Sequence, residues 1–435
     1  MIKIKGAVFT LSTCALLSCN LVQAETLEQA VFNALQKSPD MAQTMQQYYA
    51  AKSDVDIATA SFLPQLDLTA DAGKEDLDRE RIGETNKDRT NVRLSLTVPV
   101  FRGFASVNEH DRASFQVKSS YYQTLAKAEN ITLSLTKAYI DMLSAKDVIT
   151  MSEENLAHHQ KTYDLIKERS VQGVASKADL SQIRSRLARA KANMISARSN
   201  YNNAEIQYIE IAGKSPSRLT RPKVNKSYLP ENNQRVVDIA FANHQSLFSS
   251  QYDIKAASSA TKVQNAHYYP EFDVVVDRTW KEDVAGFNGH EDEWRVLLEM
   301  KWNLFAGGQK SSAHSKALHN EKASKMKLNT VQRAVKANAN ASWNAYELLE
   351  QERIFLKEYV EQTKETEKLY SQQFQAGRRS LLDLLDSQNE LFQSRKAFIS
   401  ADYDYLYAQY RVVASMSYIL DALQVNVMEG LNNEN

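Results

Sequence analysis

The sequence predicts a mainly α-helical fold in which two copies of one unit each combine a pair of β-strands with a long antiparallel helical hairpin. Three observations lead to this prediction. Glycine and proline are scarce, with 12 and 7 residues among 435, where an average chain of this length holds about 30 and about 20. Heptad patterns of apolar residues cover much of the chain, and alternating patterns of about ten residues occur four times. Glycines and several other residues also recur at a constant distance along the sequence.

The internal repeat has an offset of 204 residues. Gly103 matches Gly307 and Gly173 matches Gly377, and several apolar and acidic positions match at the same distance. The offset predicts two homologous units rather than two unrelated domains. After residue 24 the chain then divides into a first unit (25–212), a linker (213–235), a second unit (236–420) and a C-terminal tail (421–435).

The first 24 residues have the pattern of an export signal. Lys3 and Lys5 precede an apolar stretch over residues 7–17, and small residues at 22–24 make a cleavage site. Both cysteines of the chain lie in this segment, so the mature chain is expected to hold neither a disulfide nor a cysteine metal site. The alternative is a lipoprotein signal, in which Cys19 becomes the lipidated first residue.

Each unit begins with a helical stretch and continues with two alternating segments. The helices are expected over residues 26–61, with an interruption at Pro39, and over residues 236–267. About ten alternating residues is the length that a tilted transmembrane strand needs. The connections over residues 73–89 and 281–293 are rich in charged side chains, which predicts solvent loops. The expected strands cover residues 65–72, 91–100, 271–280 and 293–303.

The remainder of each unit carries a heptad pattern, which predicts helical hairpins over residues 105–212 and 309–420. At 1.5 Å per residue, the outgoing arm of the first hairpin would be on the order of 100 Å long. A rod or a tube needs elements of this length, and a single globular core does not.

Four strands per chain are too few to form a closed barrel, because closure takes about eight. An open sheet edge in lipid leaves backbone groups unpaired at a cost of several kcal/mol each. The chains are therefore predicted to associate. Two copies would supply eight strands and three would supply twelve, and the residues alone leave both numbers open.

Several motifs carry a family resemblance, and together they span nearly the whole mature chain. They are the Pro-Glx pairs at Pro64-Gln65 and Pro270-Glu271, the junctions over residues 99–104 and 302–308, and the turns at Gly173 and Gly377. With the export signal and the repeat, these features resemble the TolC family of outer membrane efflux proteins. The resemblance implies a homotrimer with a twelve-stranded β-barrel in outer membrane lipid. The hairpins would continue it as an α-barrel tube across the periplasm.

The resemblance also implies a function. The chain would be a passive exit duct for type I protein secretion or for efflux of small molecules, with a somewhat closer likeness to the secretion members. An inner membrane ABC exporter or proton-driven pump and a periplasmic adaptor protein would open it. The alternatives are a periplasmic adaptor, which should show a single hairpin inserted in Gly-rich β segments, and a structural coiled-coil protein of the cell envelope.

The candidate functional residues lie at the hairpin tips. Helix capping after a glycine turn is a sufficient explanation for Asp179 and Asp383, whereas Asp386 has Gln182 as its counterpart and is not needed for capping. By resemblance, Asp383 and Asp386 form a pore constriction, and Arg379, Asp179 and Phe374 form a gate latch between neighbouring hairpins. The adaptor would dock at Gly173, Val174, Ala175, Gly377, Arg378 and Ser380.

Composition excludes several classes of function. The 53 basic and 53 acidic residues balance, which argues against a nucleic-acid partner. A mean hydropathy of -0.48 argues against a helical multi-span membrane protein. The sequence contains no nucleophile constellation, no HExxH motif and no complete phosphate loop. We therefore predict that the chain is not an enzyme and expect no cofactor and no metal.

Overall fold

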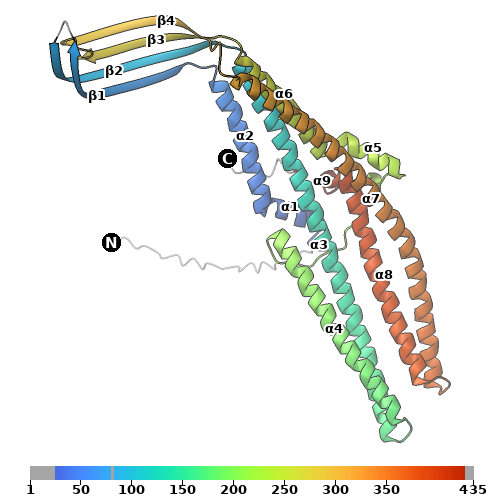
Figure 1. The fold of residues 1–435 in the computed structure, drawn as a ribbon. Helices are drawn as coiled ribbons and strands as arrows, with labels where there is room; N and C mark the ends of the chain where they lie inside the picture. The colour runs from blue at the N-terminus through green and yellow to red at the C-terminus, as the bar shows by residue number, and fades with distance from the viewer. Residues whose placement is uncertain (1–24, 80–82, 427–435) are drawn as a thin grey trace, which may run out of the picture.

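The computed structural model describes residues 25–79 and 83–426. A four-stranded sheet extends from one end of a long helical body, and the tips of two helical hairpins form the other end (Figure 1). The mainly helical fold with four strands and long hairpins is confirmed. The predicted export signal, the alternative lipidation at Cys19 and residues 427–435 of the predicted tail lie outside the described residues.

The sheet brings together the strand pairs of both repeated units. Leu94 lies opposite Arg278, so the two units share one hydrogen-bonded ladder. All neighbours are antiparallel and follow the order β1-β2-β3-β4. Within the described chain, β1 and β4 are the edges and have no strand on their outer sides. The strands are β1 (Gln65–Arg79), β2 (Gly83–Arg102), β3 (Glu271–Glu282) and β4 (His290–Lys301).

The solvent loop predicted over residues 73–89 is wrong, because β1 extends to Arg79 and β2 begins at Gly83. Opposite charges face each other across the two strands. Arg89 pairs with Asp71 at 2.5 Å and with Glu75 at 3.0 Å. Such cross-strand pairs stabilise a ladder that has few apolar side chains. The connection between β3 and β4 is likewise shorter than predicted and spans residues 283–289.

One face of the sheet is apolar in the part nearer the helical body, and this part is exposed in the single chain. Directly opposed residues share a face, and this face carries the pairs Leu68–Leu94 and Val274–Leu298. Leu68 is 68% exposed and Leu298 is 69% exposed. Trp294 lies on the same face farther from the helical body, where an aromatic ring suits a membrane interface. An apolar surface of this kind indicates contact with lipid or with another protein.

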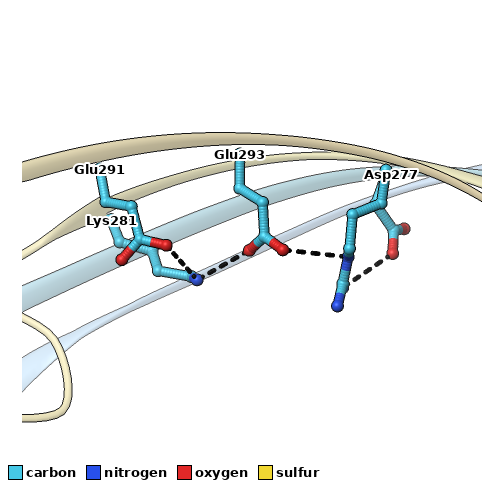
Figure 2. A network of polar contacts seen from close by, with 5 residues as sticks. Asp277, Lys281, Glu291 and Glu293 are labelled. Atoms are coloured by element: carbon cyan, nitrogen blue, oxygen red, sulfur yellow. Dashed lines mark hydrogen bonds and ion pairs between the residues drawn. The ribbon is translucent and has the colours of Figure 1, made fainter.

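The opposite face of the sheet is polar and held by ion pairs. Lys281 lies between Glu291 and Glu293, with its Nζ 3.1 Å and 2.9 Å from their carboxylate oxygens (Figure 2). On the same face, Arg295 donates to Asp277 at 3.1 Å. One face thus suits lipid and the other suits water, which is the pattern of a strand that lines an aqueous channel.

Two hairpins of long helices run from the sheet to the far end of the body (Figure 1). The outgoing helices have 67 residues each, which makes each about 100 Å long. The hairpins pair α3 (Ala105–Val171) with α4 (Lys177–Ala212) and α7 (Gln309–Gln375) with α8 (Leu381–Ser415).

Shorter helices pack beside the sheet-proximal part of the hairpins, and one of them departs from the prediction. The helix expected over residues 236–267 breaks at His244, where no proline marks the break. Ser38 and His244 adopt nearly the same conformation, with φ/ψ of -67°/120° and -66°/121°. Each caps the helix that follows, so the break belongs to the repeated unit. The helices are α1 (Leu27–Lys37), α2 (Pro39–Ala60), α5 (Asn233–Asn243) and α6 (Gln245–Ala266).

The linker and the end of the chain are tied to the middle of α3. Tyr139 is fully buried there; its hydroxyl lies 2.8 Å from the carbonyl of Glu25 and accepts the N–H of Thr220 at 2.9 Å. The short helices η1 (Lys226–Tyr228) and α9 (Ile419–Ala422) contribute side chains to the same apolar cluster. A belt of segments distant in sequence therefore fixes the hairpins at mid-height.

The two strand-to-helix junctions differ in crowding although the repeat relates them. Gly103 has a φ of +60°, and a Cβ there would lie 2.5 Å from the carbonyl oxygen of Ala266. Gly307 has a φ of +58°, and a Cβ there would meet nothing within 4 Å. The first junction therefore depends on glycine for both conformation and space.

We expect Gly103→Ala to destabilise the protein much more than Gly307→Ala does. Both substitutions add left-handed strain of about 1–2 kcal/mol, but only the first forces a side-chain atom against backbone of α6. The measurement is the temperature at which the purified protein loses helical circular dichroism. Equal losses of thermal stability in the two variants would contradict this explanation of the junction.

Candidate functional site: the hairpin tips

The two hairpins turn in the same way at their tips. Gly173 and Gly377 have φ angles of +78° and +72°. In each turn the residue after the glycine donates its N–H to a carbonyl five positions back, Val174 to Arg169 and Arg378 to Gln373, both at 2.8 Å. A helix end that is closed by backbone hydrogen bonds in this way requires a residue in the left-handed conformation, which explains both glycines.

The turns of the predicted docking surface are exposed. Val174 is 75% exposed, and Gly173, Gly377, Arg378 and Ser380 also lie on the surface. Ala175 is half-buried and packs against the apolar cluster of the tip. Five of the six residues proposed for docking are therefore accessible in the single chain.

The helix starts that follow the turns are not equivalent. At Ser176 the capping box is complete, because Asp179 accepts the Ser176 N–H at 3.1 Å and donates its own N–H to the Ser176 hydroxyl at 3.0 Å. At Ser380 only the second bond forms, from the Asp383 N–H at 3.1 Å. Capping therefore accounts for the carboxylate of Asp179, but the prediction that it also accounts for the carboxylate of Asp383 is wrong.

An apolar cluster joins the two hairpins at the tip. It contains Ile166 and Ile183 from the first hairpin and Phe374 and Leu385 from the second. Phe374 is buried, and the guanidinium of Arg169 lies 5.5 Å from the centre of its ring. Within the chain, Phe374 is thus part of the packing between hairpins, and a cation–π contact stabilises its position.

Arg379 lies over an aromatic ring that the sequence did not single out. Its guanidinium is 3.9 Å from the centre of the Tyr370 ring and 3.9 Å from the Asp383 carboxylate. The single chain does not bring Arg379 and Asp179 together. Tyr370 precedes the turn and Arg379 follows it, so only the hairpin geometry places them in contact.

Near the tips, Asp386 joins the two hairpins through an ion pair. Its Oδ1 accepts from Arg186 of α4 at 2.7 Å. Nearby, His159 of α3 is buried, and burial together with the charge of Arg186 lowers its pKa to about 4. His159 is therefore uncharged at ordinary pH. The positive charge of Arg186 is paired with the carboxylate of Asp386. Sequence reasoning missed this pair, because the two residues are 200 positions apart.

The acidic side chains of α8 line a hollow of about 290 Å³ between α7 and α8. Asp383 and Asp386 lie on one side of α8, while Leu384 and Leu385 face the apolar cluster on the other. At about 100° per residue, the two sets are close to opposite around the helix. The hollow is lined by Thr363, Thr366, Tyr370, Asp383, Asp386, Ser387 and Glu390.

In residues 25–79 and 83–426, no cluster of three or more His, Cys, Asp or Glu side chains is placed to hold a metal. No helix in the described part of the chain is both long enough and apolar enough to cross a membrane.

Known proteins of similar sequence align with most of the chain. It is 21% identical to the outer membrane efflux protein BepC of Brucella suis, over 90% of this chain and 85% of that protein. It is 22% identical to the outer membrane protein TolC of Escherichia coli, over 91% and 83% of the two chains. The alkaline protease secretion protein AprF of Pseudomonas aeruginosa is 21% identical, over 87% and 82%.

Solved structures share the fold. A membrane protein of Pseudomonas aeruginosa superposes with a TM-score of 0.80 at 18% identity, covering 90% of this chain and 93% of that one. The outer membrane protein VceC of Vibrio cholerae gives 0.76 at 15% identity, covering 92% and 96%. The family model described as outer membrane efflux protein matches residues 31–214 and 236–417, one match for each repeated unit. The chain therefore belongs to the outer membrane efflux protein family and is an outer membrane protein.

Proposed function

We propose that this chain is one subunit of a homotrimeric exit duct of an export system. The observation that carries the proposal is a sheet with an exposed apolar face and two open edges, attached to hairpins about 100 Å long. Association of the β1 edge of one copy with the β4 edge of the next would satisfy both edges. Three copies would close a twelve-stranded barrel with a polar interior, and their hairpins would form the tube.

The duct would be passive and would depend on partners at its far end. The exposed turns at Gly173 and Gly377 offer a docking place for the hairpin of a periplasmic adaptor. An inner membrane ABC exporter or proton-driven pump would supply the energy. Similar proteins are named for alkaline protease secretion and for pyoverdine export. The proposal accordingly includes type I protein secretion and efflux of small molecules.

The entrance would be the closed tip of the tube. Asp383 and Asp386 of the copies would form rings of carboxylates that favour cations. The carboxylate of Asp383 is free for this role, because the helix cap does not use it. Arg379 would reach Asp179 of a neighbouring copy and hold the tip shut. Within one chain Arg379 is already positioned by the Tyr370 ring, which leaves its charge near the surface.

The proposed duct requires the protein to lie in the outer membrane as an oligomer. We expect the mature protein to fractionate with the outer membrane and to migrate in SDS gels as an oligomer that heating converts to the monomer. The open edges of the sheet are the physical reason, since they need partner strands in lipid. A monomer recovered from the soluble periplasmic fraction would refute the proposed duct.

The carboxylate rings predict a change of ion selectivity. Asp383→Asn combined with Asp386→Asn should lower the permeability ratio of K⁺ to Cl⁻ by about twofold or more, because the entrance loses negative charge. Block by multivalent cations should weaken in parallel. Reversal potentials of single channels in planar bilayers measure the ratio. A double variant with wild-type selectivity and wild-type block would exclude these residues from the constriction.

The latch predicts a change of gating. Arg379→Ala should raise the single-channel conductance, because each lost ion pair removes about 0 to 1 kcal/mol from the closed state and all copies lose it together. Lys364→Ala, at an exposed position of α7 outside the latch and the docking turns, is the matched control and should leave conductance near the wild-type value. Equal conductance in Arg379→Ala and wild type would remove the latch.

A further inference from the structure

The acidic stripe of α8 does not end at the two aspartates. Glu390 follows Asp386 by four residues and Asp383 by seven, which places all three on one side of the helix. All three side chains line the same hollow. Glu390 corresponds to Arg186 in the first unit, at the offset of 204 residues, so the repeat carries opposite charges at this position.

The three carboxylates differ in the cations that lie beside them. Asp386 is 2.7 Å from the guanidinium of Arg186, whose side chain is only 23% exposed. Asp383 has Arg379 at the longer distance of 3.9 Å. Among the ion pairs of the described residues, none involves Glu390.

The partner of Glu390 is a neutral group. The hydroxyl of Tyr359 on α7 donates a hydrogen bond to its carboxylate. This hydrogen bond is the largest cause of the raised pKa of Tyr359, so the tyrosine keeps its proton and adds no charge of its own. No ion pair of the described chain therefore balances the negative charge of Glu390.

We propose that Glu390 is a charge-selecting carboxylate of the entrance, and that the pair of Arg186 and Asp386 contributes almost no net charge to it. An ion in the tube responds to the sum of nearby charges within a screening length of about 8 Å. The two charges of the pair are much closer together than this length and largely cancel. Glu390 then supplies the field that selects cations, and this refines the proposed ring of Asp386, whose charge Arg186 offsets. Asp383 adds to the field only where the proposed latch turns Arg379 away from it, toward Asp179 of the neighbouring copy. This inference rests on the proposed function, in which this side of α8 lines the tube.

The test compares three variants in single-channel recordings of the assembled protein. Glu390→Gln, which keeps an acceptor for Tyr359, should lower the permeability ratio of K⁺ to Cl⁻ by about twofold or more. Arg186→Gln with Asp386→Asn removes the pair as a whole and should leave the ratio close to the wild-type value. Arg186→Gln alone should raise the ratio, because it exposes the charge of Asp386.

Glu361→Gln is the matched control. Glu361 is exposed on α7 and lies about 200° around that helix from Tyr359. The same loss of charge there should not change selectivity. A wild-type ratio in Glu390→Gln would overturn the inference, and so would a ratio that falls in the Arg186→Gln, Asp386→Asn variant as it does in Glu390→Gln.

Failure of the inference can be told apart from failure of the proposed entrance. If Asp383→Asn with Asp386→Asn reduces cation selectivity and Glu390→Gln does not, the entrance is correctly placed and Glu390 has no part in it. If neither variant changes selectivity, this side of α8 does not line the tube, and both proposals fall. Heat-dependent migration in SDS gels verifies that each variant still assembles.

Discussion

The need of every backbone N–H and C=O group for a partner is the constraint on which the rest of this structure depends. The sheet satisfies it internally from β1 through β4 and leaves it unsatisfied at the two outer edges. Its apolar face suits lipid, where water is not available to replace the missing bonds. Every other large feature of the chain, from the length of the hairpins to the belt around them, is consistent with copies arranged around one axis.

The hairpins connect that membrane requirement to events about 100 Å away. α3 and α7 run without interruption from the junctions at Gly103 and Gly307 to the tips. The belt holds them at mid-height through Tyr139, and the apolar cluster around Phe374 holds them at the far end. Beside this cluster, the ion pair of Arg186 with Asp386 also joins the two hairpins.

Local patterns were sufficient to predict much of the fold, and contacts between distant residues were not. The glycine turns were predictable because their conformation is decided within about five residues. Residues 73–89 were misread as a loop because their charges are compensated across the strand pair, as Arg89 and Asp71 show. Likewise, nothing in the local sequence of α8 indicates that Asp386 meets Arg186, or that the carboxylate of Asp383 is free of its helix cap. The site residues were identified by resemblance, whereas their charge balance required the three-dimensional structure.

The two open edges also have a genetic consequence. β1 and β4 are different surfaces, so copies that join through them form a ring in which each subunit contacts two others. A subunit damaged at one edge can still bind a healthy neighbour through the other and then leaves the ring unsealed. A mutant allele of this kind would be dominant over the wild type when both are expressed in one cell, and an allele that destroys both edges would be recessive.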